Sequence, residues 1–126
     1  MFARAYRFHL IVDLCTAVAV LVLLALTRNP WGAQAGFALL SLHAIAAIRH
    51  PKGGVEDERA VLHRLIAWRA GMATTWVLFV LTATVVLVSH GTQPIPSWIL
   101  GWMIWVGWLI QSTVGALVAL RLDRVA

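Results

Sequence analysis

Three ionisable side chains stand out because they belong to otherwise apolar stretches of this 126-residue sequence. Asp13 is the one acidic residue well within an apolar block, and His43 lies six residues before Arg49. Arg69 lies at the end of the charged central stretch 48–70, where the next apolar block begins. If the blocks are antiparallel membrane helices, all three residues lie one or two helical turns from the same membrane surface. A charge at that depth is costly unless it is paired, and its default interpretation is a functional site, so we predict a buried polar cluster of Asp13, His43 and Arg69.

This cluster has two interpretations. In the first, Asp13 and Arg69 form an ion pair with His43 as a hydrogen-bond partner, and the contacts only hold helices in register. Interhelical polar contacts of this kind contribute about 0.6–2 kcal/mol. In the second, the residues form a proton-coupled or cation-binding site, with Asp13 as the proton-binding carboxyl and with a histidine, which changes charge near neutral pH. The sequence leaves both interpretations open.

Motifs of catalysis and metal binding are missing from the sequence. No nucleophile constellation, phosphate-binding loop or paired-carboxylate motif occurs, so we expect a protein that is not an enzyme. No C-x-x-C or H-E-x-x-H spacing occurs either, and we predict no metal site. The main expectation is a protein without a cofactor. A haem held by His9 and His43 is the alternative, because both histidines lie near the same membrane boundary.

Tryptophans recur along the last apolar block, at Trp98, Trp102, Trp105 and Trp108. At 100° per residue the first three share one helix face, and Trp108 lies about 60° further round. The stripe predicts packing or lipid contact, with Trp98 at the membrane interface. A flat aromatic surface for a quinone, a carotenoid, another pigment or a partner helix is the alternative, with Gln111 as a neighbouring hydrogen-bonding group.

The elements that must position these residues are membrane helices. The chain is 61% hydrophobic and 12% charged, with a mean hydropathy of +0.85, whereas a soluble domain is nearer half apolar and a quarter charged. The apolar residues also fall in long blocks, separated by turn signals such as Asn29-Pro30 and Pro94-Ile95-Pro96. We therefore predict an all-α integral membrane protein with a single domain, residues 1–126, built as a bundle of four transmembrane helices in two hairpins. Their predicted ranges are about 8–26, 31–48, 57–88 and 98–120.

The basic residues predict the orientation of the bundle. Nine of the ten Lys and Arg residues lie at block ends that share one side of the membrane, and Arg28 alone lies at the other. The positive-inside rule then places both termini and the central loop in the cytoplasm, in a multi-pass protein of the inner membrane. The net charge of +5 does not indicate nucleic-acid binding, because no basic face exists apart from these block ends.

Two families share features with this chain. The segment Val55–Arg59, V-E-D-E-R, followed by an apolar helix and a final hairpin, resembles small uncharacterised four-helix bacterial membrane proteins with an E-D-E-R-like motif before helix three. That resemblance implies a fold and no activity. The chain is also similar to small multidrug-resistance transporters, which have four helices, little more than a hundred residues, and an acidic residue in helix one that binds protons and cationic drugs. Asp13 would take that role, although the family uses Glu there and lacks the long charged central loop.

These features favour a non-catalytic accessory or assembly subunit of a larger membrane complex, or a homo-oligomer. Small residues that let helices approach closely, together with the tryptophan stripe, indicate contact with other membrane subunits or with a second copy, besides the lipid bilayer. The competing function is a proton-coupled transporter of a small molecule or cation that uses Asp13. A third is a haem-, quinone- or pigment-binding subunit in electron transfer or photosynthesis.

Overall fold

The computed structural model describes residues 2–43 and 58–125, and every regular element in those two ranges is helical. The prediction of an all-α chain is therefore confirmed for the described residues. The elements are the helices α1 (Phe2–Thr27), α2 (Pro30–Ala33), α4 (Glu58–His90) and α5 (Ser97–Val125), with the 3₁₀ helix η1 (Gln34–Leu42) directly after α2.

A tight turn joins α1 to α2. Arg28 has a φ of 48°, in the left-handed region, and its N–H donates to the carbonyl of Leu24 at 2.9 Å, which ends α1. The side chain of Asn29 then accepts a hydrogen bond from the N–H of Trp31 at 3.0 Å and caps α2. Pro30 occupies the first position of α2, where a missing N–H costs nothing. This short polar segment reverses the chain, as the sequence predicted.

Helix α2 and η1 continue in one direction and pack against α1. The residues of this segment that are buried, Ala33, Gly36, Phe37 and Leu40, recur with helical spacing. They meet a matching face of α1, where Val20 is buried beside Phe37 and Leu40. A Cβ atom on Gly36 would lie 2.8 Å from Cγ2 of Val20, so only glycine permits this approach. Of the predicted helix 31–48, residues 44–48 lie outside the described residues.

Helices α4 and α5 form the second hairpin. Gly91 has a φ of 55°, and its N–H donates to the carbonyl of Leu87 at 3.1 Å, so α4 ends in the left-handed cap that glycine favours. A close approach holds the two helices together, because a Cβ atom on Gly71 would lie 2.6 Å from the backbone oxygen of Gln111. The two helices are longer than the predicted ranges 57–88 and 98–120. Residues 55–57 of the V-E-D-E-R segment lie outside the described residues.

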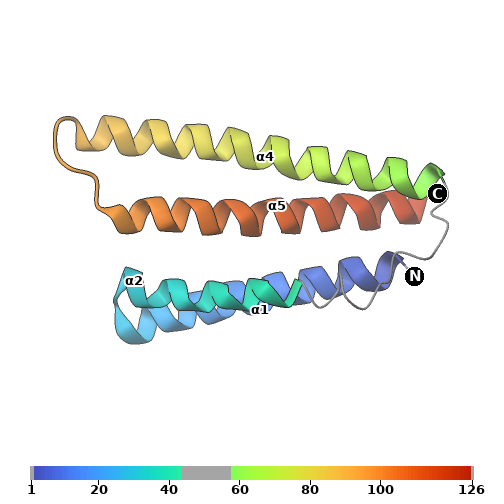
Figure 1. Ribbon diagram of the computed structural model, residues 1–126, viewed down its shortest axis with the longest axis horizontal. Helices are drawn as coiled ribbons and strands as arrows, with labels where there is room; N and C mark the ends of the chain where they lie inside the picture. The colour runs from blue at the N-terminus through green and yellow to red at the C-terminus, as the bar shows by residue number, and fades with distance from the viewer. Residues whose placement is uncertain (1, 44–57, 126) are drawn as a thin grey trace.

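Helix α5 lies between α4 and the α1–α2–η1 hairpin (Figure 1). Its contacts with α1 make most of the junction between the two hairpins, and α4 packs chiefly on α5. The start of α1 and the end of α5 lie at one end of the molecule, and the turns at residues 28–29 and 91–96 lie at the other (Figure 1).

Three of these helices are long and apolar enough to cross a membrane: Tyr6–Thr27, Val61–His90 and Ser97–Leu122. Their outward side chains are apolar and exposed, for example Leu26 at 78% and Val88 at 78%, which suits contact with lipid. The described part of the second predicted span, Pro30–Leu42, is too short to reach across a hydrocarbon core of about 30 Å.

Candidate functional site

A buried carboxylate lies at the junction of the two hairpins. Asp13 is 3% exposed, and it belongs to a face of α1 that also carries the buried residues Val12, Thr16 and Val20. These positions share one side of a helix because Val12, Thr16 and Val20 lie one, three and seven residues from Asp13. That face meets η1 on one side and α5 on the other. The apolar surroundings make an unsatisfied carboxylate costly, so the neighbours of Asp13 decide what the site does.

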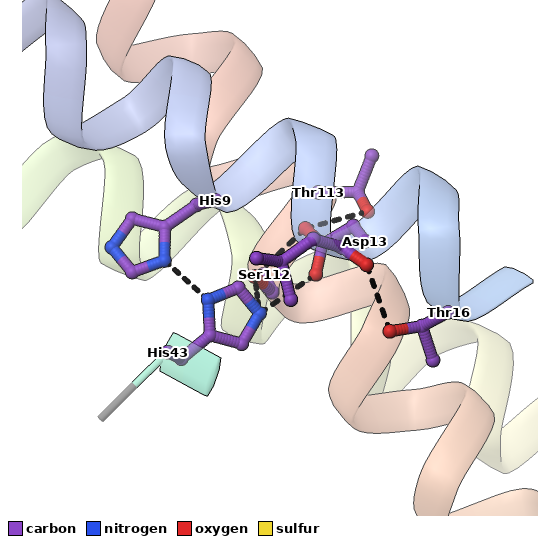
Figure 2. Close-up of polar contacts among 7 residues, drawn as sticks. His9, Asp13, Thr16, His43, Ser112 and Thr113 are labelled. Carbon is purple, nitrogen blue, oxygen red and sulfur yellow. Dashed lines mark hydrogen bonds and ion pairs between the residues drawn. The ribbon is translucent and has the colours of Figure 1, made fainter. Parts of the chain in front are cut away.

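Both oxygens of Asp13 accept hydrogen bonds (Figure 2). Its Oδ1 lies 2.9 Å from Nε2 of His43, at the end of η1. Its Oδ2 accepts from the hydroxyls of Ser112 at 2.9 Å and of Thr113 at 3.2 Å, both on α5. Three segments that are far apart in the sequence therefore converge on one carboxylate. Among the described residues no buried side-chain nitrogen or oxygen atom lacks a hydrogen-bond partner.

A second histidine extends this network. Nδ1 of His9 is hydrogen bonded to Nδ1 of His43, and the two ring centroids are 4.5 Å apart (Figure 2). An ionised carboxylate only accepts hydrogen bonds, so Nε2 of His43 carries a proton when Asp13 is ionised. One further proton then lies between the two Nδ1 atoms. His9, His43 and Asp13 are thus three titratable groups in series, each hydrogen bonded to the next.

The outer end of this series lines a cavity of about 450 Å³. His9, His43 and Ser112 contribute to its wall, together with Arg64 and Trp68 of α4. Asp13 does not line the cavity, and its side chain is almost completely enclosed. A molecule in the cavity would therefore contact Asp13 only through His43 and Ser112.

The structure does not bring Arg69 to this cluster, which corrects the predicted set of Asp13, His43 and Arg69. Arg69 is exposed, and no ion pair joins it to Asp13 in the described part of the chain. Ala67 and Gly71 of α4 face α5. Arg69 is two positions from each and points about 160° away from both. In addition, α5 lies between α4 and α1 and supplies Ser112 and Thr113 instead.

The two histidines proposed as haem ligands are also in the network, but their geometry does not fit a haem. Their Nδ1 atoms contact each other directly, and no room remains between them for an iron atom. Over residues 2–43 and 58–125, no group of three or more His, Cys, Asp or Glu side chains is arranged to hold a metal ion.

Two tryptophans of the α5 stripe, Trp102 and Trp105, make contacts within the molecule. Nε1 of Trp102 donates to the carbonyl of Pro30 at 2.8 Å. Phe37 packs edge-on against Trp102 and is stacked on Trp105, with ring centroids 5.5 and 5.9 Å apart. Trp98 borders a separate apolar groove between α4 and α5. Trp108 and Gln111 lie elsewhere, on the wall of the cavity beside His43.

Ser112 and Thr113 are the site residues that the sequence analysis did not identify. Hydroxyl side chains in apolar helices commonly bond to the carbonyl four residues earlier, as Thr16 does with Val12 at 2.8 Å. The presence of a serine and a threonine at these positions therefore does not indicate that they bind Asp13. The available signal is their depth, since Ser112 lies nine residues before Arg121 and Asp13 six residues after Arg7.

Comparisons with protein-family models, with curated proteins and with solved structures find no match to this chain. Inferences about its function therefore rest on the geometry described above.

Proposed function

We propose that this protein is a small proton-coupled membrane transporter, with Asp13 as its proton-linked carboxylate. The observation that carries the proposal is the series of hydrogen bonds from His9 through His43 to Asp13, which begins at a cavity and ends at a buried carboxylate.

The partner of Asp13 distinguishes this function from a purely structural contact. An arginine keeps its charge at every physiological pH, so an Asp–Arg pair would act as a permanent clamp. A histidine gains and loses a proton in the physiological range. Because the nitrogen ligand of Asp13 is His43, the charge of the pair depends on proton supply.

The proton path is balanced at each atom. A proton from the cavity binds Nε2 of His9, and the proton on Nδ1 of His9 passes to Nδ1 of His43. His9 is then neutral, and His43 is an imidazolium that faces the carboxylate of Asp13. Transfer of the Nε2 proton of His43 to Oδ1 of Asp13 leaves a neutral imidazole and a neutral carboxyl group.

The position of Asp13 links this chemistry to movement. Ser112 and Thr113 donate to Asp13 across the α1–α5 contact, which makes most of the junction between the hairpins. Protonation of Oδ1 neutralises the carboxylate, so Oδ2 becomes a weaker acceptor for these two hydroxyls. The hydrogen bonds across the junction therefore differ in strength between the two protonation states of Asp13, and such a difference is what allows proton binding to shift a conformational equilibrium.

Flux measurements in proteoliposomes test this function. The probes are three single-ring compounds that differ in charge: p-toluenesulfonate, benzyltrimethylammonium and benzyl alcohol. We expect a pH gradient to drive uptake of one charged probe through the native protein and not through Asp13→Asn. Equal uptake by the two proteins, or no gradient-driven uptake of either charged probe, contradicts the proposal.

The exposed surface of α4 favours a second function, as a homo-oligomer or an accessory subunit. Only 6% of its candidate span is buried, against 22% for α1, and Trp68 and Trp76 are more than half exposed. Native mass measurement of the purified protein in mild detergent tests it. A stable dimer or a co-purified membrane subunit supports this function, and a monomer at all concentrations contradicts it.

We also propose the inner membrane as the location, with both termini in the cytoplasm. The positive-inside rule supports this orientation, because Arg28 is the only Lys or Arg at its end of the sequence blocks. The cavity then lies nearer the cytoplasmic surface.

A further inference from the structure

We infer that η1 is a two-state element that connects Asp13 to the cavity in one state and disconnects it in the other. In the first state η1 is the 3₁₀ helix of this structure, and in the second it is an α-helix. The inference rests on the proposed transport function and names the segment whose movement couples it to protons. It follows from the side chains that η1 presents to the junction of the two hairpins.

The length of η1 is unusual for a 3₁₀ helix. It contains nine residues, whereas runs longer than three or four residues are uncommon, because the hydrogen-bond geometry is poorer than in an α-helix. The two flanking residues share its geometry, with φ and ψ of −62° and −27° at Ala33 and of −59° and −30° at His43. Side-chain contacts must therefore stabilise this form of the segment against an α-helix.

Four side chains are spaced three residues apart along η1 and its C-terminal cap. A 3₁₀ helix has three residues per turn, so side chains with this spacing point in one direction. They form a row made of Gln34, Phe37, Leu40 and His43. The row faces α5 and the buried face of α1, and Figure 1 shows η1 running alongside α1.

The two ends of the row hold different parts of the junction. At one end, Nε2 of Gln34 donates to the carbonyl of Trp98 at 3.4 Å. Phe37, one turn further, packs on two tryptophans of α5. At the other end His43 bonds Asp13. Both ends of the row are therefore anchored while η1 is a 3₁₀ helix.

An α-helix cannot keep both anchors. In a 3₁₀ helix the six steps from Phe37 to His43 make two full turns, so both side chains face the same way. At 100° per residue the same six steps leave them about 120° apart. An α-helical η1 could pack Phe37 on α5 or bond His43 to Asp13, but not both. The two contacts together hold η1 in the 3₁₀ form, and the loss of either one releases it.

The protonation state of Asp13 decides how strongly one anchor holds. A hydrogen bond to an ionised group is roughly twice as strong as one between neutral groups. When Asp13 binds a proton, its contact with His43 weakens, whereas the packing of Phe37 does not change. Phe37 is 2% exposed and remains in place. The α-helical form then gains relative to the 3₁₀ form, and His43 is the residue that turns out of the junction.

Rotation of His43 interrupts the series of proton carriers. His43 is hydrogen bonded to His9 on one side and to Asp13 on the other, so a turn of about 120° breaks both contacts. Asp13 keeps its proton beside Ser112 and Thr113 and loses its hydrogen-bonded path to the cavity. The proton then cannot return by the way it came, which is the step that tight coupling needs.

Other ionisable groups near His43 do not replace Asp13 in this role. Among the described residues, the cavity wall beside His43 carries three of them, Tyr6 and His9 of α1 and Arg64 of α4. Helix α5 faces the carboxylate with two uncharged hydroxyls, Ser112 and Thr113. All of these groups are the same in the native protein and in Asp13→Asn, so a comparison of the two isolates the charge of Asp13.

The distance between two spin labels on η1 tests the inference in the full chain in nanodiscs. The labels are attached to Trp31→Cys and Leu42→Cys, two exposed positions, in the background Cys15→Ala. Conversion of nine residues from a rise of about 2.0 Å to about 1.5 Å should shorten the distance by about 4 Å. We expect the long distance at alkaline pH, and the short one in Asp13→Asn and in the native protein at acid pH.

An unchanged distance in Asp13→Asn, or a short distance in the native protein at alkaline pH, would overturn the inference. Labels at Leu100→Cys and Leu117→Cys, both exposed on α5, give the reference. That distance should be the same in every sample, because α5 is an α-helix in both states. The pH series on the native protein repeats the test without a change at the site.

Phe37→Ala tests the other anchor. It should also shorten the distance across η1, because the row loses its packing on α5 while His43 keeps its bond to Asp13. Phe79→Ala is the matched control, since Phe79 is an exposed phenylalanine of α4 whose ring packs on Trp76. Equal distances in Phe37→Ala and Phe79→Ala would show that side-chain contacts do not hold η1 in the 3₁₀ form.

The outcomes separate this inference from the transport function. If the distance shortens in Asp13→Asn but no pH gradient drives uptake through the native protein, the two-state element stands and the transport function is wrong. If uptake depends on Asp13 but the distance across η1 is the same in both proteins, the transport function stands and the two-state element is wrong.

Discussion

Nε2 of His43 lies 2.9 Å from Oδ1 of Asp13, although the two residues belong to different helical segments and are thirty positions apart. Asp13 is 3% exposed and the side chain of His43 is 14% exposed, so the contact is largely sheltered from solvent. The hydroxyls of Ser112 and Thr113 complete the coordination of the carboxylate from α5. This shared partner makes the three segments interdependent, and the variants below separate its chemical role from its structural role.

Asp13→Asn should abolish gradient-driven uptake while it preserves most of the fold. The amide keeps an acceptor for the hydroxyls, but it cannot bind and release a proton. Asp13→Ala should lower the stability further, by roughly 1–3 kcal/mol, because the buried partners lose their acceptor. Thermal unfolding in detergent measures stability. If Asp13→Asn transports like the native protein, the carboxylate has no proton-linked role.

His9→Gln should slow proton-coupled uptake without a large loss of stability. Glutamine still offers a hydrogen-bonding group to His43, but it does not relay a proton. The contact between Asp13 and His43 remains. The comparison with His43→Gln is informative, because that change also alters the direct partner of Asp13. Uptake rates measured over a series of pH values should lose their dependence on pH in both variants, and an unchanged pH profile in His9→Gln argues against the series of proton carriers.

Ser112→Ala should destabilise the junction between the hairpins by about 0.6–1.7 kcal/mol, the range of interhelical hydrogen bonds in membranes. Ser41→Ala is the matched control. The Ser41 hydroxyl is exposed and donates to the carbonyl of Ala38 in its own helical segment at 2.7 Å, so its loss should change the free energy of unfolding by less than about 0.5 kcal/mol. Equal effects of the two substitutions would contradict the assigned role of Ser112.

Gly71→Ala should loosen the contact of α4 with α5. The added Cβ would lie 2.6 Å from the backbone oxygen of Gln111, which cannot move aside cheaply. Gly107→Ala provides the comparison, since its Cβ would lie 3.4 Å from a methyl group of Thr75. We expect a lower unfolding temperature for Gly71→Ala and little change for Gly107→Ala. The reverse order would show that these helices pack in another register.

Cysteine labelling tests the proposed orientation. The sequence contains one cysteine, Cys15, so Cys15→Ala gives a background for single-cysteine variants. In intact cells, a membrane-impermeant maleimide should label Thr92→Cys in the turn after α4, and should label Ala126→Cys only after the cells are broken. Labelling of both sites from outside would place the turn and the C-terminal end in one compartment, against the positive-inside prediction.

The depth of a residue along its helix could be predicted from the sequence. The rotation of each helix about its own axis, which decides the neighbour that a side chain faces, could not. Counting residues from the charged block ends placed Asp13 and His43 in one layer, and the structure shows them in contact. The same counting placed Arg69 there, but Arg69 points away from α5. A membrane helix that is apolar on all sides gives little indication of which face packs, because lipid and protein neighbours are both apolar.

The order of the helices in the bundle could not be predicted from the sequence either. The sequence indicated two hairpins, but it did not indicate which helix of one hairpin packs against which helix of the other. The structure places α5 against α1, so Ser112 and Thr113 reach Asp13 and the tryptophans Trp102 and Trp105 pack on Phe37. Close approaches at Gly36 and Gly71 show why these pairings hold, since each admits a backbone where a Cβ atom would collide.

The amino-acid sequence by itself determined the helical class, the turns at residues 28–29 and 91–96 and the three long apolar helices, because hydrophobic length and helix-breaking residues act locally along the chain. Only the tertiary structure decided which polar groups surround Asp13. A carboxylate in an apolar interior must find its hydrogen-bond partners on other helices, and their identity depends on the rotation and order of those helices, which no local pattern records.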